Sequence, residues 1–146
     1  MKKLLALTLC SLSFAALARE NVSFTHWGNS GGNQSYYACD YAQSQTENFL
    51  DLLGATDIDV SCTGGIQSWG MAQPVTVRAA FDLPVVTTNT VEAVQVQGDS
   101  WSPACGLNVQ IVTSMIKVFS NVQIVKKSDS CAFTSSNYFY LLNITR

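Results

Sequence analysis

The chain has 146 residues and a formal net charge of −2, with 47% hydrophobic residues, 12% charged residues, five cysteines and one histidine. This apolar content excludes a disordered tail, and the lack of a basic excess argues against a nucleic-acid-binding protein. A single histidine excludes a metal centre built from several histidines. We therefore expect no metal and no other cofactor.

The N-terminal segment has the pattern of a secretory signal peptide. Lys2 and Lys3 precede an uncharged apolar run over 4–17, which is shorter than the roughly 20 residues that span a membrane. Small residues lie three and one positions before the expected cleavage after Ala18. Cleavage takes 18 of the 146 residues, one cysteine and two lysines, leaving 128 residues (19–146), four cysteines and a charge of −4. The short Lys-Lys start is typical of bacterial signals, so we predict a periplasmic or secreted bacterial protein with no transmembrane segment after cleavage.

The first half of the mature chain predicts a strand-helix-strand-strand unit. Apolar and polar residues alternate over 22–26, 57–60 and 75–81, a period of two that is typical of half-buried strands. Between the first two, apolar residues from Cys39 to Leu53 follow the 3/4 spacing of an amphipathic helix. Gly54 is a natural residue to end that helix.

The second half repeats this order of elements. Alternation at 94–97 predicts a strand, and Ser102-Pro103 announces a helix that runs from Cys105 to Phe119. Strands are expected at 122–124 and 138–144. A shift of 66 residues superposes Cys105 on Cys39, together with the helices and strands that follow.

This repetition predicts the architecture. We expect one domain over 19–146, built from pseudo-repeats 19–83 and 84–146 that join near Leu83-Pro84. The predicted fold class is α+β, with a mainly antiparallel sheet of about six strands and two helices packed on it.

The lengths of the predicted helices and strands predict two disulfides. A helix of about 15 residues rises roughly 22 Å, and a returning strand of seven residues covers about 23 Å, so the chain comes back beside the start of the helix. This pairs Cys39 with Cys62 and, in the second half, Cys105 with Cys131. No Cys-x-x-Cys motif is present, and bridges in a small exported domain are usually structural.

His26 is the one histidine that could act as a general base. It lies at the end of the first predicted strand, with Ser30, Ser35 and Asp40 nearby in the sequence. No motif of a nucleophilic serine supports this group, so we interpret His26 as an ordinary strand-end residue.

Aromatic residues in loops are the strongest candidates for a binding surface. The tryptophans lie beside Gly, Ser or Pro and outside the periodic segments, and two tyrosines precede the first helix. Aromatic side chains in such loops are typical of partner surfaces, although they could instead cover the disulfides and the ends of the core. The candidate residues are Trp27, Tyr36, Tyr37, Trp69 and Trp101.

These patterns favour a small, disulfide-stabilised, non-catalytic binding module. Its expected partner is a protein, a peptide or a component of the cell envelope, and not a nucleic acid. Two alternatives remain open: a small cofactor-free hydrolase that uses His26, and a thiol-disulfide protein.

Overall fold

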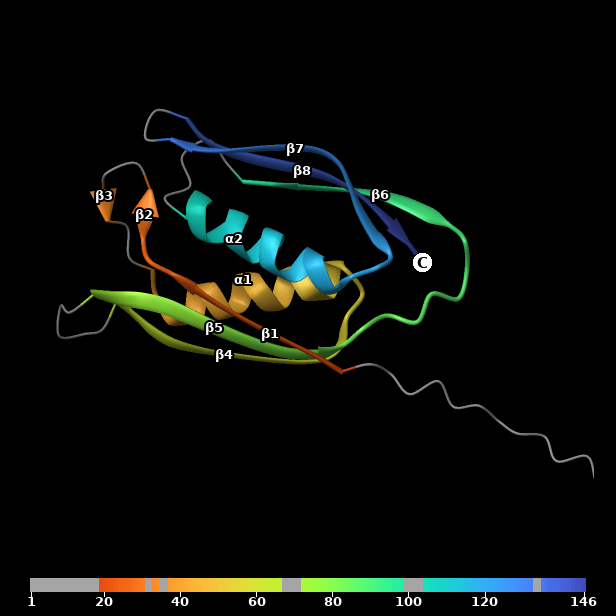
Figure 1. Ribbon diagram of the computed structural model, residues 1–146, viewed down its shortest axis with the longest axis horizontal. Coiled ribbons are helices and arrows are strands. Elements are labelled where there is room, and N and C mark those ends of the chain that lie inside the picture. The colour runs from red at the N-terminus through yellow and green to blue at the C-terminus, as the bar shows by residue number, and fades with distance from the viewer. Residues whose placement is uncertain (1–18, 31–32, 35–36, 67–71, 99–103, 133–134) are drawn as a thin grey trace, which may run out of the picture.

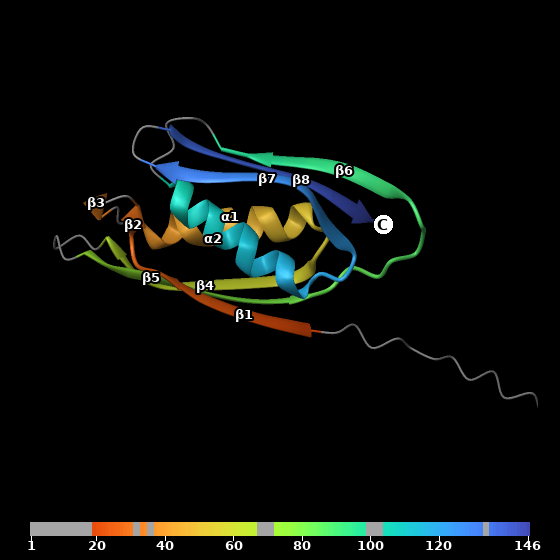
Figure 2. The same ribbon diagram turned by 45° about the horizontal axis from the view of Figure 1, so that its top comes forward.

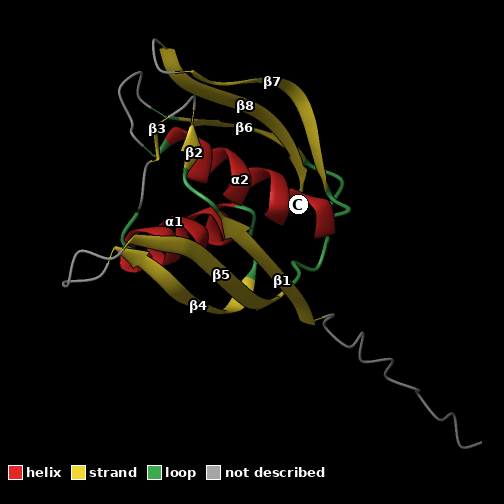
Figure 3. Ribbon diagram, turned by 60° about the vertical axis from the view of Figure 1, so that its left-hand side comes forward, coloured by secondary structure: helices red, strands yellow, loops and turns green. Residues whose placement is uncertain are grey.

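The computed structural model has an α+β fold in which two helices lie between two antiparallel sheets (Figures 1 and 3). It describes residues 19–30, 33–34, 37–66, 72–98, 104–132 and 135–146. Six long strands and both predicted helices are present. The fold class predicted from the sequence is therefore confirmed.

The first sheet has the strand order β1-β5-β4, with β1(Arg19–His26), β4(Thr56–Ile66) and β5(Ala72–Asp82). The helix α1(Cys39–Leu52) connects β1 to β4, and two short strands, β2(Asn29–Ser30) and β3(Asn33–Gln34), form a separate ladder. Alternate residues of β5 are buried against α1, as a strand with one wet face requires.

The second sheet, β6-β8-β7, has the same topology. Its strands are β6(Val91–Gln97), β7(Val122–Ala132) and β8(Ser135–Thr145), and Figure 3 shows β8 between the other two. The helix α2(Cys105–Met115) continues into a short 3-10 turn, η1(Ile116–Val118), before β7. In each half the third strand therefore inserts between the first two, which makes the two units topologically equivalent.

The grouping of the strands differs from the single sheet of about six strands that the sequence predicted. Because the third strand of each unit pairs with both others, each half completes its own three-stranded sheet. The halves then meet through their helices, and not edge to edge. Figure 2 shows both helices enclosed between the two sheets.

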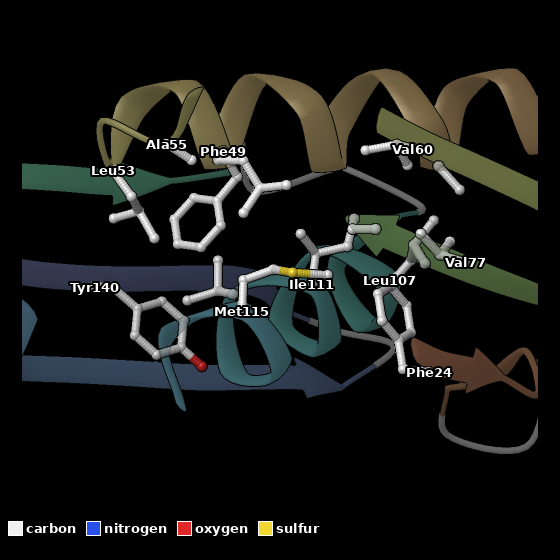
Figure 4. Packing of buried hydrophobic residues seen from close by; sticks show 14 of the residues in the cluster. Phe24, Phe49, Leu53, Ala55, Val60, Val77, Leu107, Ile111, Met115 and Tyr140 are labelled. Carbon is white, nitrogen blue, oxygen red and sulfur yellow. The ribbon is translucent and has the colours of Figure 1, made fainter. Parts of the chain in front are cut away.

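One hydrophobic core is shared by both halves (Figure 4). The Phe81 ring of the first sheet stacks on Phe119, which follows η1, with ring centroids 5.6 Å apart. Burial of each large aliphatic side chain contributes roughly 1.5–3 kcal/mol. The fully buried aliphatic side chains include Leu50, Leu53, Leu107, Ile111, Met115, Leu142 and Ile144.

Both predicted disulfides are confirmed. Cys39–Cys62 and Cys105–Cys131 have Cα–Cα distances of 5.5 and 5.6 Å, and each joins the first residue of a helix to the strand that follows it. Next to the first bridge, Gly65 has a φ of +81°, and a Cβ there would lie 2.5 Å from the carbonyl oxygen of Tyr37. A glycine is therefore needed where β4 passes the start of α1.

Candidate functional site

The predicted aromatic surface is only partly contained in the described residues. Trp27 is 69% exposed, whereas Tyr37 is buried and lies 5.4 Å from the His26 ring. Tyr36, Trp69 and Trp101 lie outside the described residues. β1 and β4 both run antiparallel to β5, so they end on the same side of the molecule. The use of Trp27 as a partner surface stays a prediction.

His26 forms part of the contact between the two halves. It is 7% exposed, and its Nδ1 lies 2.7 Å from the side-chain oxygen of Gln110 on α2. The Gln110 amide nitrogen donates to the main-chain carbonyl of Thr25, 3.0 Å away. This fixes the amide orientation, so the Gln110 oxygen accepts and His26 Nδ1 donates. The second ring nitrogen, Nε2, is buried without a partner among the described residues.

This geometry differs from that of a general base. A base must reach the proton it removes, and its other nitrogen is usually oriented by an acid. The hydrogen-bond partner of His26 is a neutral amide, and its free nitrogen faces the protein interior. The ring is placed to hold β1 against α2.

A cleft of about 290 Å³ opens between α1, α2 and β6. Its apolar lining comes from all three elements: Phe49 and Leu52 of α1, Ile111 and Val112 of α2, and Val96 of β6. Figure 4 shows Phe49 and Ile111 reaching from their helices into the shared core. The cleft therefore has a hydrophobic floor continuous with the core.

Five amide side chains share the lining with this floor, and Tyr138 completes it. Such groups offer donors and acceptors without charge, whereas the described lining residues include no Asp, Glu, Lys, Arg or His. The site is thus suited to a neutral, polar ligand with apolar parts. The five amides are Gln45, Asn48, Gln95, Gln97 and Asn108.

Asn108 supplies the most constrained of these amides. It is 7% exposed, and its nitrogen lies 3.4 Å from the Tyr41 hydroxyl. Its oxygen is buried without a hydrogen-bond partner in the described part of the chain. An unpaired buried acceptor costs about 1–3 kcal/mol, so a ligand donor that reached it would gain an interaction.

The equivalent junction in the other half is closed. There α2 packs directly on β1, and Gln110 joins the strand through Thr25 and His26. At the α1–β6 junction, by contrast, the cleft separates the helix from the strand. The near-symmetry of the fold is therefore broken at the place where the cavity forms.

The sequence reasoning missed this amide group. Glutamine and asparagine side chains on helices and strands belong to no catalytic motif. The alternation over 94–97 indicates only that Gln95 and Gln97 lie on the solvent-exposed face of a strand. The available signal was the uncharged character of that face, which is uncommon for an exposed strand.

Two other features are absent from the described residues. No helix there is long and apolar enough to cross a membrane, and no three His, Cys, Asp or Glu side chains gather where they could hold a metal ion. In comparisons with family models, characterised proteins and solved structures, the chain matches none.

Proposed function

We propose that the protein is an exported, non-catalytic binding module that holds a neutral partner in the cleft between α1, α2 and β6. The observation that carries the proposal is the lining of this cleft, which combines an apolar floor with five amide side chains and has no charged side chain among its described residues. Apolar floors with a few convergent polar groups are typical of binding sites.

The chemistry of the cleft supports binding over catalysis. Amide and hydrocarbon side chains do not ionise near neutral pH, so they offer no general acid or base. His26, the residue of the alternative hydrolase, is held by Gln110 in the interior. A hydrolase that depended on His26 would lose its activity in a folded His26→Ala variant.

Export to the bacterial periplasm, or beyond it, is part of the proposal. It rests on the signal-peptide pattern of residues 1–18 and on two disulfides, which persist in oxidising compartments. N-terminal sequencing of the protein recovered outside the cytoplasm should begin at Arg19. A thiol-disulfide protein, the second alternative, would show readily reduced cysteines in that material, whereas structural bridges would show none.

Site-specific photo-crosslinking in the producing cells tests the cleft. The photoreactive amino acid p-benzoylphenylalanine at position 52, which lines the cleft, should form adducts with a partner. The same amino acid at exposed position 123 of β7 should form none, because that residue lies away from the cleft lining.

A third position separates the cleft from the aromatic surface. Adducts from position 27 alone would place the partner at Trp27 and contradict the cleft proposal. The absence of adducts from all three positions would contradict both.

A further inference from the structure

We propose that the partner is an extended, uncharged peptide segment that adds to the free edge of β6 as a fourth strand of the second sheet. The inference rests on the proposed function, because it names the occupant of the same cleft. It is carried by the main-chain geometry of β6, by the other strand edges and by the cleft walls.

The hydrogen-bond register shows which groups of β6 are free. In an antiparallel pair, alternate residues bond to the neighbouring strand and the others point away. Gly98 donates to the Tyr138 carbonyl at one end of the β6–β8 ladder, and Arg146 donates to the Thr90 carbonyl at the other. These two pairs lie eight residues apart on the β6 side, and the register between them has no bulge.

The even-numbered residues of β6 therefore bond to β8. The main-chain N–H and C=O groups of Ala93, Gln95 and Gln97 point to the open edge, and no described residue pairs with them. Two of these three residues also line the cleft. Alternate residues of an extended chain lie about 6.6 Å apart. The free main-chain groups of β6 therefore have the same spacing as the donors and acceptors of an added peptide strand.

The other strand edges are protected against such pairing. β4 carries two register irregularities together with Asp57 and Asp59, and β7 carries a bulge followed by Lys126 and Lys127. Bulges and charges are the usual means of blocking edge pairing. β1 is packed against α2. The stretch 93–97 of β6 has no charge, proline or bulge.

The opposite wall of the cleft fits the same occupant. A strand added to β6 presents alternate side chains toward the second sheet's inner face, where Phe49, Leu52 and Ile111 provide an apolar floor. Gln45 and Asn48 of α1 can bond to its main chain. A helix amide already bonds to the main chain of an edge strand in the other half, where Gln110 of α2 donates to the Thr25 carbonyl of β1.

A strand lying between a sheet edge and a helix is an established mode of peptide recognition. Main-chain hydrogen bonds supply affinity in that mode, and side-chain pockets supply selectivity. The lack of charge in the described cleft lining selects against acidic or basic segments, because their burial there would leave a charge unpaired.

Three synthetic heptapeptides test the proposal with the full mature protein. Each is acetylated and amidated, with threonine alternating with valine, leucine or phenylalanine. In an NMR titration, at least one peptide should shift the backbone amides of Ala93, Gln95 and Gln97 and slow their hydrogen exchange at least tenfold. N-methylation of alternate residues of that peptide removes the N–H groups that would donate to β6. This form should bind at least tenfold more weakly.

Paired variants localise the binding. Asn48→Arg places a long cation in the cleft and should weaken binding at least tenfold, whereas Gln123→Arg introduces the same cation at an exposed amide residue of β7 and should leave binding unaltered. Both residues are exposed, so both variants should keep the wild-type circular dichroism spectrum.

Three results overturn the inference. They are failure of all three peptides, equal binding of the N-methylated form, and binding that leaves the β6 amides unchanged. If any of these occurs while position 52 still yields cross-links, the strand-addition inference fails and the cleft remains the binding site. If position 52 yields none, the proposed function fails as well.

Discussion

Gln110 connects the two halves through a single side chain. Its amide bonds both to the His26 ring and to the Thr25 carbonyl, so it satisfies two groups of β1 from α2. The His26 ring is buried, and this contact gives its Nδ1 a hydrogen-bond partner there. The residue that the sequence presents as a possible base is therefore placed as a structural contact.

We expect Gln110→Leu to lower the free energy of unfolding by about 2–6 kcal/mol, because it leaves two partly buried polar groups unpaired at about 1–3 kcal/mol each. Urea unfolding followed by tryptophan fluorescence measures the change. Gln43→Leu is the matched control: Gln43 bonds Glu47 one turn along α1, a pair worth only a few tenths of a kcal/mol. Equal effects of the two substitutions would show that the Gln110 contacts contribute no more to the free energy of unfolding than the surface pair does.

Tyr140 places a phenol in the core of the second sheet. Its hydroxyl is buried without a hydrogen-bond partner in the described structure. Burial, with a smaller contribution from the charge of Asp129, raises its pKa from 10.0 to about 12. The folded state therefore favours the neutral phenol more strongly than the unfolded state does.

This shift predicts a loss of stability in alkali. The contribution of the neutral phenol is complete below pH 10 and is lost as the pH rises toward about 12, a fall of about 2–3 kcal/mol in the free energy of unfolding. Tyr140→Phe should make this alkaline decline shallower. At pH 7 it should leave stability unchanged or raise it by up to about 1 kcal/mol, since it removes an unpaired polar group. Urea unfolding at pH 7, 9 and 11 measures both effects, and an unchanged alkaline slope would contradict the assignment.

At the scale of elements, the junction of β4 with α1 depends on Gly65. Its positive φ disfavours any side chain, and a Cβ would meet the main-chain oxygen of Tyr37, which cannot move aside cheaply. The same oxygen accepts a hydrogen bond from Ile66 at 3.0 Å. The end of β4 is thus held against the residues that precede α1.

We expect Gly65→Ala to destabilise the protein by more than 2 kcal/mol. Gly54→Ala provides the comparison, because Gly54 also has a positive φ of +84° but its Cβ would meet the flexible Arg146 side chain. That variant should lose about 1 kcal/mol, the cost of the backbone conformation alone. Thermal and urea unfolding of the two variants would contradict this account if Gly54→Ala were the more damaging.

The elements were predictable because each is encoded locally. Periods of two and 3.6 residues identified the strands and helices, and chain length alone returned Cys62 to Cys39. Strand grouping is not local: a period of two says that one face is wet, but not which strand lies alongside. The cleft escaped prediction for the same reason, since Gln45 of α1 and Gln95 of β6 come to line one cleft only when the two halves pack together.

At the scale of the whole molecule, the two halves share one interior. Phe81 stacks on Phe119, and α2 packs on β1 of the opposite half. A unit of about 60 residues buries a smaller share of its surface than a larger domain does, so its stability by itself is marginal. Each half therefore contributes a sheet and a helix to a core that neither encloses alone, and a local weakening should be felt throughout.

Removal of one disulfide tests this coupling. The Cys39–Cys62 bridge closes a loop with a sequence separation of 23 residues, so Cys39→Ala with Cys62→Ala should lower the free energy of unfolding by about 3 kcal/mol. In a cooperative core the loss should be equal for amides of Val77 in β5 and Leu142 in β8, although β8 lies in the other half. Native-state hydrogen exchange measures both amides, and removal of the Cys105–Cys131 bridge, with a separation of 26, should likewise lower the protection of both amides equally. A loss confined to the half that carries the missing bridge would contradict the shared core, because each sheet would then open with its own helix alone.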